Sequence, residues 1–252
     1  MSAAILRVDG DTGALTGHYE DGKFALSHFS GERPYLIDVT PQSDGTILLT
    51  LNDHFGKREL TAYRPAAARA RALPEPTDPA QHTKIKDPTK PLEFSFRDVN
   101  GHLVSNTDPR FQGKVVLANI TGSWCPNCHD EAPFLAELYR KYRRAGLEIV
   151  ALDFEEPEQL EDLTRLRAFI KHYGIEYTVL IGGVPEQVND KLPQLVNLNA
   201  WPTTVLIGRN GLVQGIHVGF ASPASGDFND QLKEGITTRV QALLAENQHA
   251  SR

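Results

Sequence analysis

The chain has 252 residues, of which 40% are hydrophobic and 23% are charged, and its formal net charge is −6 at pH 7. This ordinary globular mix excludes collagen-like, coiled-coil and wholly disordered chains. No window approaches 18 consecutive apolar residues, and the start of the chain lacks the basic and apolar regions of a signal peptide, so we expect neither a membrane span nor a leader. No block of lysine and arginine is present, and we expect no nucleic-acid partner.

The first 64 residues carry short runs of alternating apolar and polar side chains, separated by turn residues. This pattern predicts a small antiparallel β domain over residues 1–64. The segment has no paired carboxylates, glycine-rich phosphate loop or cysteine, so we expect a role in packing or docking. The expected strands are Phe24–Phe29, Tyr35–Val39, Thr46–Leu51 and Arg58–Tyr63.

Proline then becomes frequent, with six prolines from Pro65 to Pro91. Because proline fixes φ and lacks a backbone donor, residues 65–91 are expected to form a proline-rich linker or an extended strap. A short helix is expected at Ala66–Ala72. The domain boundary is placed in this segment.

Residues 92–252 alternate between strand and helix patterns, which indicates βαβ crossovers and a largely parallel core. A hairpin with the type I′ signal Asn210-Gly211 follows, and a helix closes the chain. The expected strands are Lys114–Ile120, Leu147–Asp153, Tyr177–Ile181, Thr203–Ile207 and Leu212–Gly219, and the expected helices are Pro133–Arg144, Pro157–Tyr173, Glu186–Val196 and Phe228–Glu246.

The whole chain contains two cysteines, Cys125 and Cys128, with Pro126 and Asn127 between them. They follow a predicted buried strand, at the point where a helix is expected to begin. The first turn of a helix has N–H groups without intrahelical partners and carries the positive end of the macrodipole, and both favour a thiolate. We therefore expect Cys125 to be exposed at the start of the helix, with Cys128 on the same face and close enough to bridge. Pro126 suits the first turn, and Trp124 is placed to shield the pair.

This placement predicts thiol–disulfide exchange. The Cys125 thiolate would attack a substrate disulfide, a mixed disulfide would form, and Cys128 would resolve it. Run in reverse, the same chemistry oxidises a dithiol.

Three other uses of a cysteine pair compete with thiol exchange. A structural disulfide across four residues removes little chain entropy, and a closed zinc site needs four ligands, for which the chain has no second cysteine pair. Cys125-x-x-Cys128-His129 also matches the attachment motif of c-type haem. The strand-to-helix context favours thiol chemistry over haem, and His129 is then expected to be a surface residue of the helix.

The segment Val115–Phe134 resembles the active-site segment of the thioredoxin superfamily, and specifically of the TlpA-like thiol-disulfide oxidoreductases. The shared motif is Trp-Cys-x-x-Cys followed by Glu131 and Pro133, and Trp201-Pro202-Thr203-Thr204 is similar to the cis-proline segment of that family. The likeness covers roughly residues 92–246. It implies a bacterial thiol-disulfide oxidoreductase of the α/β class with a thioredoxin-like fold, in which helices flank a central mixed sheet, and it favours a reductase.

The resemblance also implies roles for single residues. Pro202 would be cis and face Cys125, leaving the backbone of Trp201 free to pair with an extended substrate. The Trp201 side chain could contact substrate or belong to the core. The remaining residues expected to bind substrate are Trp124, Pro126 and Asn127.

Proton transfer to Cys128 is expected to involve Glu131. Many thioredoxins place a buried aspartate six residues before the first cysteine, where this chain has Asn119, which cannot carry the proton. Glu131 lies three residues beyond Cys128 on the same helix face, and partial burial would raise its pKa towards the working range. The alternative is that Glu131 is simply a favourable acid in the first helical turns.

Two other functions compete with thiol–disulfide exchange. A peroxiredoxin-type peroxidase would carry Pro-x-x-x-Thr-x-x-Cys, but Ala118 and Gly122 stand in place of the proline and threonine. A carrier hypothesis makes the β domain the working part and the thioredoxin-like half redox-inactive or weakly active.

We expect no cofactor and no metal, and we expect as partners protein disulfide or dithiol substrates and an upstream electron donor or acceptor protein. The resemblance implies a periplasmic or other extracytoplasmic protein whose signal peptide is absent from this chain, with a cytoplasmic location as the alternative.

Overall fold

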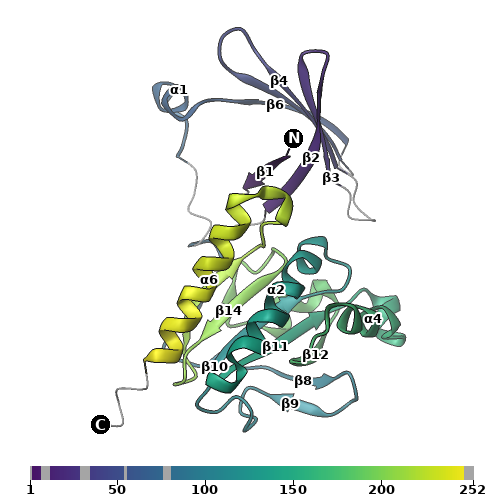
Figure 1. Ribbon diagram of the computed structural model, residues 1–252, viewed down its shortest axis with the longest axis vertical. Helices are drawn as coiled ribbons and strands as arrows, with labels where there is room; N and C mark the ends of the chain where they lie inside the picture. The colour runs from purple at the N-terminus through teal and green to yellow at the C-terminus, as the bar shows by residue number, and fades with distance from the viewer. Residues whose placement is uncertain (1, 7–11, 29–34, 54–55, 76–80, 247–252) are drawn as a thin grey trace.

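The computed structural model describes the chain except for residues 1, 7–11, 29–34, 54–55, 76–80 and 247–252. The described residues form a six-stranded sheet from the N-terminal part and a seven-stranded sheet with helices from the remainder (Figure 1). The expected class, α/β with an antiparallel β unit in front, is confirmed. No helix among these residues is long and apolar enough to cross a membrane.

The N-terminal sheet is a meander in which each strand pairs antiparallel with its neighbour in the sequence. Asp21 and Gly22 join two of the strands with φ angles of 48° and 82°, as a type I′ turn requires. One face carries a buried core of Leu15, Leu26, Ile37 and Leu51. The strands are β1 (Ser2–Leu6), β2 (Thr12–Glu20), β3 (Lys23–His28), β4 (Tyr35–Pro41), β5 (Ile47–Asp53) and β6 (Gly56–Ala62).

The sequence predicted four of these strands and missed β1 and β2. β2 contains Gly13 and Gly17, which weaken a strand pattern, and pairing with β1 and β3 holds it extended. Phe29, the last residue of one expected strand, lies outside the described residues.

The proline-rich segment contains helix α1 (Pro65–Ala70), close to the helix expected at Ala66–Ala72. It also contains β7 (Lys84–Ile85), which pairs antiparallel with β13 (Leu195–Val196). The end of this segment is therefore attached to the second part of the chain. The boundaries at residues 64 and 91 stay a prediction.

The second sheet has the order β15-β14-β10-β11-β12-β8-β9. Only its three central strands are parallel, so the core is less parallel than the sequence suggested. β8 and β9 were not predicted, because each is short and exposes alternate side chains. The strands are β8 (Ser95–Asp98), β9 (Leu103–Ser105), β10 (Val115–Thr121), β11 (Leu147–Phe154), β12 (Thr178–Gly183), β14 (Thr203–Ile207) and β15 (Val213–Val218).

Three helices cover one face of this sheet: α2 (Pro126–Tyr142), α4 (Thr164–Tyr173) and α6 (Asp227–Ala245). Their apolar stripes bury Leu135, Leu166 and Val240 against alternate residues of β10 and β11. The opposite face packs against segments around residues 92–111 and 188–198. The central strands are therefore buried on both faces.

Three helix predictions were wrong in extent. The helix expected at Pro133–Arg144 is α2, which already begins at Pro126 and contains Pro133 in its interior. The helix expected at Pro157–Tyr173 is broken into α3 (Pro157–Glu161) and α4, because Asp162 is extended and its Oδ1 accepts hydrogen bonds from the backbone N (3.1 Å) and the hydroxyl (2.6 Å) of Thr164. The segment expected as one helix at Glu186–Val196 contains only the short η3 (Pro185–Gln187) and α5 (Val188–Lys191) before β13.

The hairpin of β14 and β15 is present, but its turn is not type I′. Gly211 has a φ of 79° and donates its N–H to Gly208 O at 2.9 Å, whereas the φ of Asn210 is not positive. This is a type I turn followed by a left-handed glycine, the usual three-residue hairpin loop.

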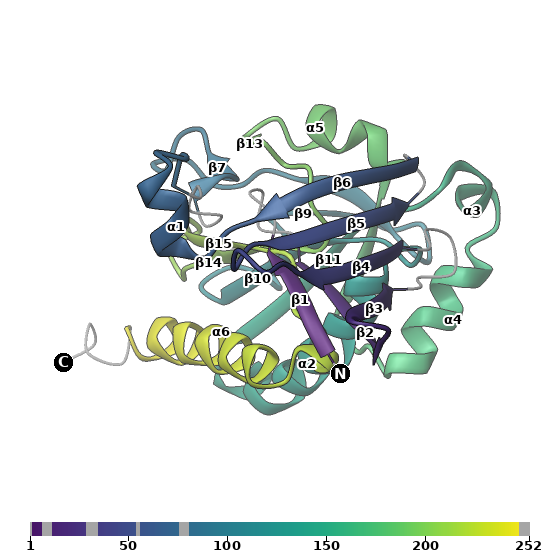
Figure 2. The same ribbon diagram turned by 90° about the horizontal axis from the view of Figure 1, so that it is seen from above.

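The N-terminal sheet meets the second part of the chain near the start of α6. β1 and β2 lie close to η4 (Pro223–Ser225), the short helix that leads into α6 (Figures 1 and 2). Seen from above, the strands β1–β6 lie over the second sheet and its helices (Figure 2).

Candidate active site

The two cysteines form a disulfide at the start of α2. Cys125 is the N-cap residue, with extended backbone angles, and its Sγ accepts a hydrogen bond from Cys128 N at 3.3 Å. The Cα atoms of the pair are 5.2 Å apart, within the range that a disulfide spans. Pro126 occupies the first turn as expected, where its missing N–H is not needed. The pair can therefore open and close at the positive end of the helix macrodipole without unwinding it.

The expectation that Cys125 is exposed was wrong. Only 2% of Cys125 and 1% of Cys128 is accessible in this disulfide form. As N-cap, Cys125 directs its sulfur inward to the first turn of α2, and residues distant in the sequence pack around it. A reacting partner must therefore reach a recessed sulfur.

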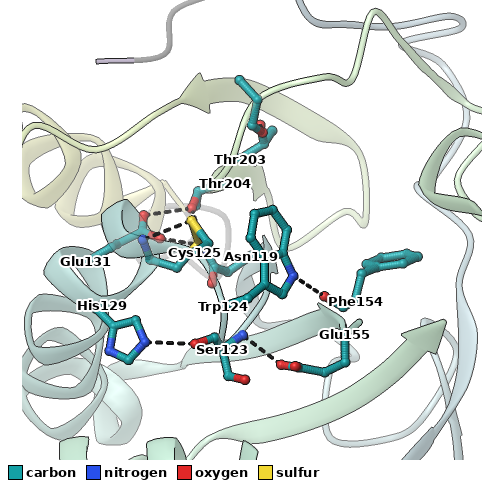
Figure 3. Close-up of a disulfide and its surroundings, with 12 residues drawn as sticks. Asn119, Ser123, Trp124, Cys125, His129, Glu131, Phe154, Glu155, Thr203 and Thr204 are labelled. Atoms are coloured by element: carbon teal, nitrogen blue, oxygen red, sulfur yellow. Dashed lines mark hydrogen bonds between the residues drawn. A yellow bond between two sulfur atoms is a disulfide. The ribbon is translucent and has the colours of Figure 1, made fainter. Parts of the chain in front are cut away.

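Two tryptophans pack together beside the disulfide. Trp124 donates its indole N–H to Phe154 O at 2.9 Å and meets Trp201 edge to face, with ring centroids 5.5 Å apart (Figure 3). Trp201 is half-buried against the core face that includes Phe154, which fits the core alternative, but part of it stays accessible. The rings form an apolar wall next to Cys125.

The Trp201–Pro202 peptide bond is cis, as the resemblance implied. Pro202 is buried, and its carbonyl accepts a hydrogen bond from Gly219 N at 2.8 Å. The backbone of Trp201 makes no backbone hydrogen bond within the described ranges of the chain. Of the remaining predicted substrate contacts, Pro126 and Asn127 are half-buried in the first turn of α2.

Glu131 is buried under the helix start, in a network with two other polar side chains. Asn119 Nδ2 donates to Glu131 Oε2 at 2.7 Å, and Thr204 Oγ1 donates to Oε1 at 3.0 Å (Figure 3). Burial raises the pKa of Glu131 from 4.5 to about 7, and the two hydrogen bonds oppose this rise. Asn119, which cannot carry a proton itself, thus holds the carboxyl that can. Figure 3 shows Glu131 and Thr204 beside Cys125.

All three polar groups of Ser123, two residues before Cys125, are held by distant side chains. Its N–H donates to Glu155 Oε1 at 2.6 Å, and its hydroxyl accepts from Arg165 Nε at 2.9 Å. Its carbonyl lies 2.8 Å from His129 Nε2. Arg165 also donates to Glu155 and to Glu156, each at 2.8 Å. This brace, formed by Glu155, Arg165 and His129, fixes the loop that presents the disulfide.

His129 is not the surface residue that the sequence predicted. It is half-buried between α2 and α4, where Nδ1 lies 2.9 Å from Tyr173 Oη and the ring meets Phe169 edge to face. With Nε2 on Ser123 O, both ring nitrogens are engaged by the protein. His129 therefore connects the active-site loop to α4, a position that does not suit a haem ligand.

The backbone at Gly122 has no room for a side chain. A Cβ built there would meet Trp124 Nε1 and would lie 2.6 Å from Phe154 O. The threonine of a peroxidase motif cannot stand at this position while Trp124 keeps its hydrogen bond. The geometry therefore argues against a peroxiredoxin-type site.

The sequence of the second half of the chain identifies its family. The AhpC/TSA family matches residues 86–216, just over half of the chain. The chain belongs to the AhpC/TSA family. The thioredoxin-superfamily likeness seen in the sequence is thereby confirmed, and the N-terminal sheet lies outside the matched range.

Similar proteins agree with this family. The chain is 32% identical over 127 residues to the thiol-disulfide oxidoreductase ResA of Geobacillus kaustophilus (strain HTA426), a match covering 50% of this chain and 66% of that relative. It is 30% identical over 131 residues to ResA of Halalkalibacterium halodurans, covering 51% of this chain and 66% of the relative. The chain thus spans slightly less than two thirds of the length of these relatives.

A solved structure shares the fold of the second half. The thiol:disulfide interchange protein of the thioredoxin family from Chlorobium tepidum TLS has a TM-score of 0.50 and 24% identity, and covers 64% of this chain and 100% of its own. A solution structure from Bacteroides thetaiotaomicron has a TM-score of 0.51 and 21% identity, with coverage of 67% and 96%. Both likenesses show that the fold of this AhpC/TSA-family protein is thioredoxin-like.

The sequence analysis missed several residues that surround the disulfide. Thr204, Glu155 and Arg165 hold the site from β14, from the residue after β11 and from α4. One pattern in the sequence could have identified Glu155. Acidic residues follow the apolar run of β11, and the carboxyl end of this strand lies beside that of β10, which leads to the cysteines. Their partners could not be identified, because the hydrogen bonds join residues 32 to 73 positions apart.

Proposed function

We propose that this AhpC/TSA-family protein is a thiol–disulfide oxidoreductase that exchanges the Cys125–Cys128 disulfide with protein thiols and disulfides. The observation that carries the proposal is this disulfide at the start of α2, with the buried acid Glu131 three residues further along the helix. The similar ResA proteins of Geobacillus kaustophilus and Halalkalibacterium halodurans are named thiol-disulfide oxidoreductases. The likeness to the TlpA-like group favours a reductase.

The reaction has two exchange steps. The Cys125 thiolate attacks a substrate disulfide and forms a mixed disulfide, while one substrate sulfur leaves with the electron pair. Cys128 then attacks the Cys125 sulfur, the Cys125–Cys128 bond forms, and the second substrate sulfur leaves. Glu131 acts as the proton acceptor for Cys128, because a carboxyl with a pKa of about 7 exchanges protons readily at neutral pH. An electron-donor protein reduces the disulfide again.

The substrate backbone would pair with Trp201 as an added strand. Support comes from the cis bond to Pro202 and from the free backbone groups of Trp201 among the described residues. Trp124, Pro126 and Asn127 would border the bound segment from the other side. Because Cys125 is recessed, an extended chain fits this site better than a folded surface.

The N-terminal sheet would dock or select the protein partner, and the chain would divide at the boundaries 1–64, 65–91 and 92–252. Five apolar side chains pair directly across β2–β6 and form one row on a single face. The ends of this apolar row are 60% and 53% exposed. Its members are Tyr19, Phe24, Val39, Leu49 and Leu60.

We place the protein outside the cytoplasm, in the periplasm of a bacterium, on the strength of the family likeness. Titration of the Cys125–Cys128 couple against glutathione tests both this placement and the direction of exchange. A potential near −270 mV fits a reductase, whereas one near −120 mV fits an oxidase.

Insulin reduction with a Cys128→Ser variant tests the proposed function. The wild type should reduce insulin with dithiothreitol as electron source, and Cys128→Ser should hold insulin in a mixed disulfide on Cys125. Cys125→Ser is the matched control and should trap nothing. If the wild type is inactive and Cys128→Ser traps no protein, the carrier hypothesis replaces the enzyme.

A further inference from the structure

Asp153, near the end of β11, is a carboxyl group that the site described above does not use. The side chain is fully buried. Neither Oδ1 nor Oδ2 has a hydrogen-bond partner in the part of the chain that the structure describes. Buried carboxyl groups normally have such partners, so this one requires an explanation.

The Asp153 carboxyl lines a small cavity that also reaches Cys128. The cavity has a volume of about 10 Å³ and is lined by both Cys128 and Asp153, together with the polar residues Asn119, Thr121 and Tyr177. This volume is close to the smallest that admits one water molecule, and a water there would have several polar neighbours. The resolving cysteine and the unpartnered carboxyl thus line one chamber, whose other walls are mainly apolar.

We propose that Asp153 exchanges a proton with Cys128 through a water in this cavity. The inference rests on the proposed dithiol exchange and adds a second acid to it. When a donor thiolate attacks Cys125, the Cys125–Cys128 bond breaks, and Cys128 leaves with the electron pair and takes the proton of Asp153. When Cys128 later resolves a mixed disulfide, its proton returns to the Asp153 carboxylate, the Cys125–Cys128 bond forms, and the substrate sulfur leaves as a thiolate.

Asp153 and Glu131 differ in their freedom to bind this proton. Both oxygens of Glu131 accept hydrogen bonds, from Asn119 and Thr204, whereas neither oxygen of Asp153 accepts one from a donor among the described residues. Asn119, which donates to Glu131, also lines the cavity, so one amide connects Glu131 to the chamber.

The charged groups around Asp153 favour its protonated form in the disulfide state. Burial, followed by the charge and the close approach of the Glu155 carboxyl just after the strand, raises the pKa of Asp153 well above its ordinary value. Arg165 from α4 opposes this rise, but its hydrogen bonds go to Ser123, Glu155 and Glu156. Glu131 on α2 and Tyr177 beside β12 are the other titratable groups near the chamber. Burial and the charge of Glu155 thus favour the protonated carboxyl of Asp153 while Cys128 is in the disulfide.

A thiol titration tests the inference without enzyme activity. In a Cys125→Ser chain that also carries Glu131→Gln, so that Glu131 cannot titrate, the ultraviolet absorbance of the Cys128 thiolate should rise in two coupled steps, since one proton is shared with Asp153. Adding Asp153→Asn should leave one step and lower the upper midpoint by about one pH unit or more. Asp153→Ala should give the same curve if the asparagine variant folds poorly. Glu148→Gln, which removes a half-buried carboxyl of the same strand outside the cavity, should keep both steps. Identical curves with and without Asp153 would overturn the inference.

Single-turnover kinetics on the chain with both cysteines provide the second measurement. With oxidised insulin, Asp153→Asn should form the mixed disulfide at the wild-type rate and resolve it about tenfold more slowly at pH 7, with a changed pH profile. If this variant resolves the mixed disulfide at the wild-type rate, only the role of Asp153 is contradicted and the proposed function stands. Absence of any mixed disulfide in the wild type contradicts the proposed function instead, and the thiol titration still decides on Asp153.

Discussion

At the scale of single residues, the site combines one recessed disulfide with three buried acids, of which Glu155 is paired with Arg165. Within the described part of the chain neither Glu131 nor Asp153 forms an ion pair, and burial raises the pKa of both. Keeping such groups costs stability at neutral pH, where the unfolded chain would ionise them. The cost is understandable if the acids serve the resolving thiol.

The stability of the disulfide form should reveal the Glu131 carboxyl directly. Its pKa is about 7 in the folded chain and near 4.5 in the unfolded chain, so the folded state binds more protons between these values. The free energy of unfolding therefore falls as pH rises through this window. Between pH 5 and pH 8 the wild type should lose about 2.5 kcal/mol relative to Glu131→Gln. Urea unfolding at both pH values measures this loss.

Asp153 is present in both the wild type and Glu131→Gln, so its contribution to the free energy of unfolding cancels when the two are compared. Glu137→Gln, at an exposed position on the same helix, is the matched control and should follow the wild type. Parallel pH curves for wild type and Glu131→Gln would show that Glu131 does not titrate as described.

Glu131 should also control the rate of resolution. Glu131→Gln keeps the size of the side chain but cannot accept the proton of Cys128, so release from the mixed disulfide should slow about tenfold at pH 7. Rapid-mixing measurements of thiol release from pH 5 to 9 should show a flatter profile than in the wild type. Unchanged rates and an unchanged Cys128 pKa would leave Glu131 as a structural acid only.

At the scale of elements, the active-site loop is held by groups from α4 and from the end of β11. Glu155 is fully buried and depends on Arg165 for its countercharge. Arg165→Gln should therefore lower the free energy of unfolding by about 3 kcal/mol, because a buried carboxylate loses its partner. Chemical denaturation at pH 7 measures the effect.

Two further variants separate this loss from a general weakening of α4. The double variant with Glu155→Gln should recover part of the stability, since the buried charge is then removed too. Arg167→Gln, at an exposed position two residues along the same helix, should cost less than about 1 kcal/mol. Equal losses for the two arginine variants would contradict the brace.

Elements whose signals are local could be predicted from the sequence, and the contacts between them could not. The apolar run of β10, the Cys125–Cys128 motif and the Trp201-Pro202 segment are all visible in neighbouring residues. The break at Asp162 depends on a side-chain cap that competes with the helix, and β1 and β2 depend on pairing. Arg165 and Asp153 gained their significance only from the fold, which brings α4 and β11 to the start of α2.

At the scale of the whole molecule, the N-terminal sheet gives the thioredoxin-like part an additional surface. The apolar row on β2–β6 ends in Tyr19 and Leu60, both more than half exposed. Such a row on a sheet face is suited to hold an apolar segment of a protein substrate. A small disulfide has no such segment, so the sheet should matter for proteins only.

The variant Tyr19→Ser with Leu60→Ser should therefore lower kcat/KM for insulin about tenfold, as expected for losing roughly 1.4 kcal/mol of apolar contact. The rate with a small aromatic disulfide should stay at the wild-type value, because its reaction involves only the recessed Cys125. Leu36→Ser is the matched control: Leu36 is 42% exposed on the opposite face of the same sheet, and its loss should change neither rate. Equal losses for both substrates would mean that the substitutions disturb the active site itself. An unchanged insulin rate would mean that the sheet takes no part in substrate docking, and the exchange chemistry would then belong to the thioredoxin-like part alone.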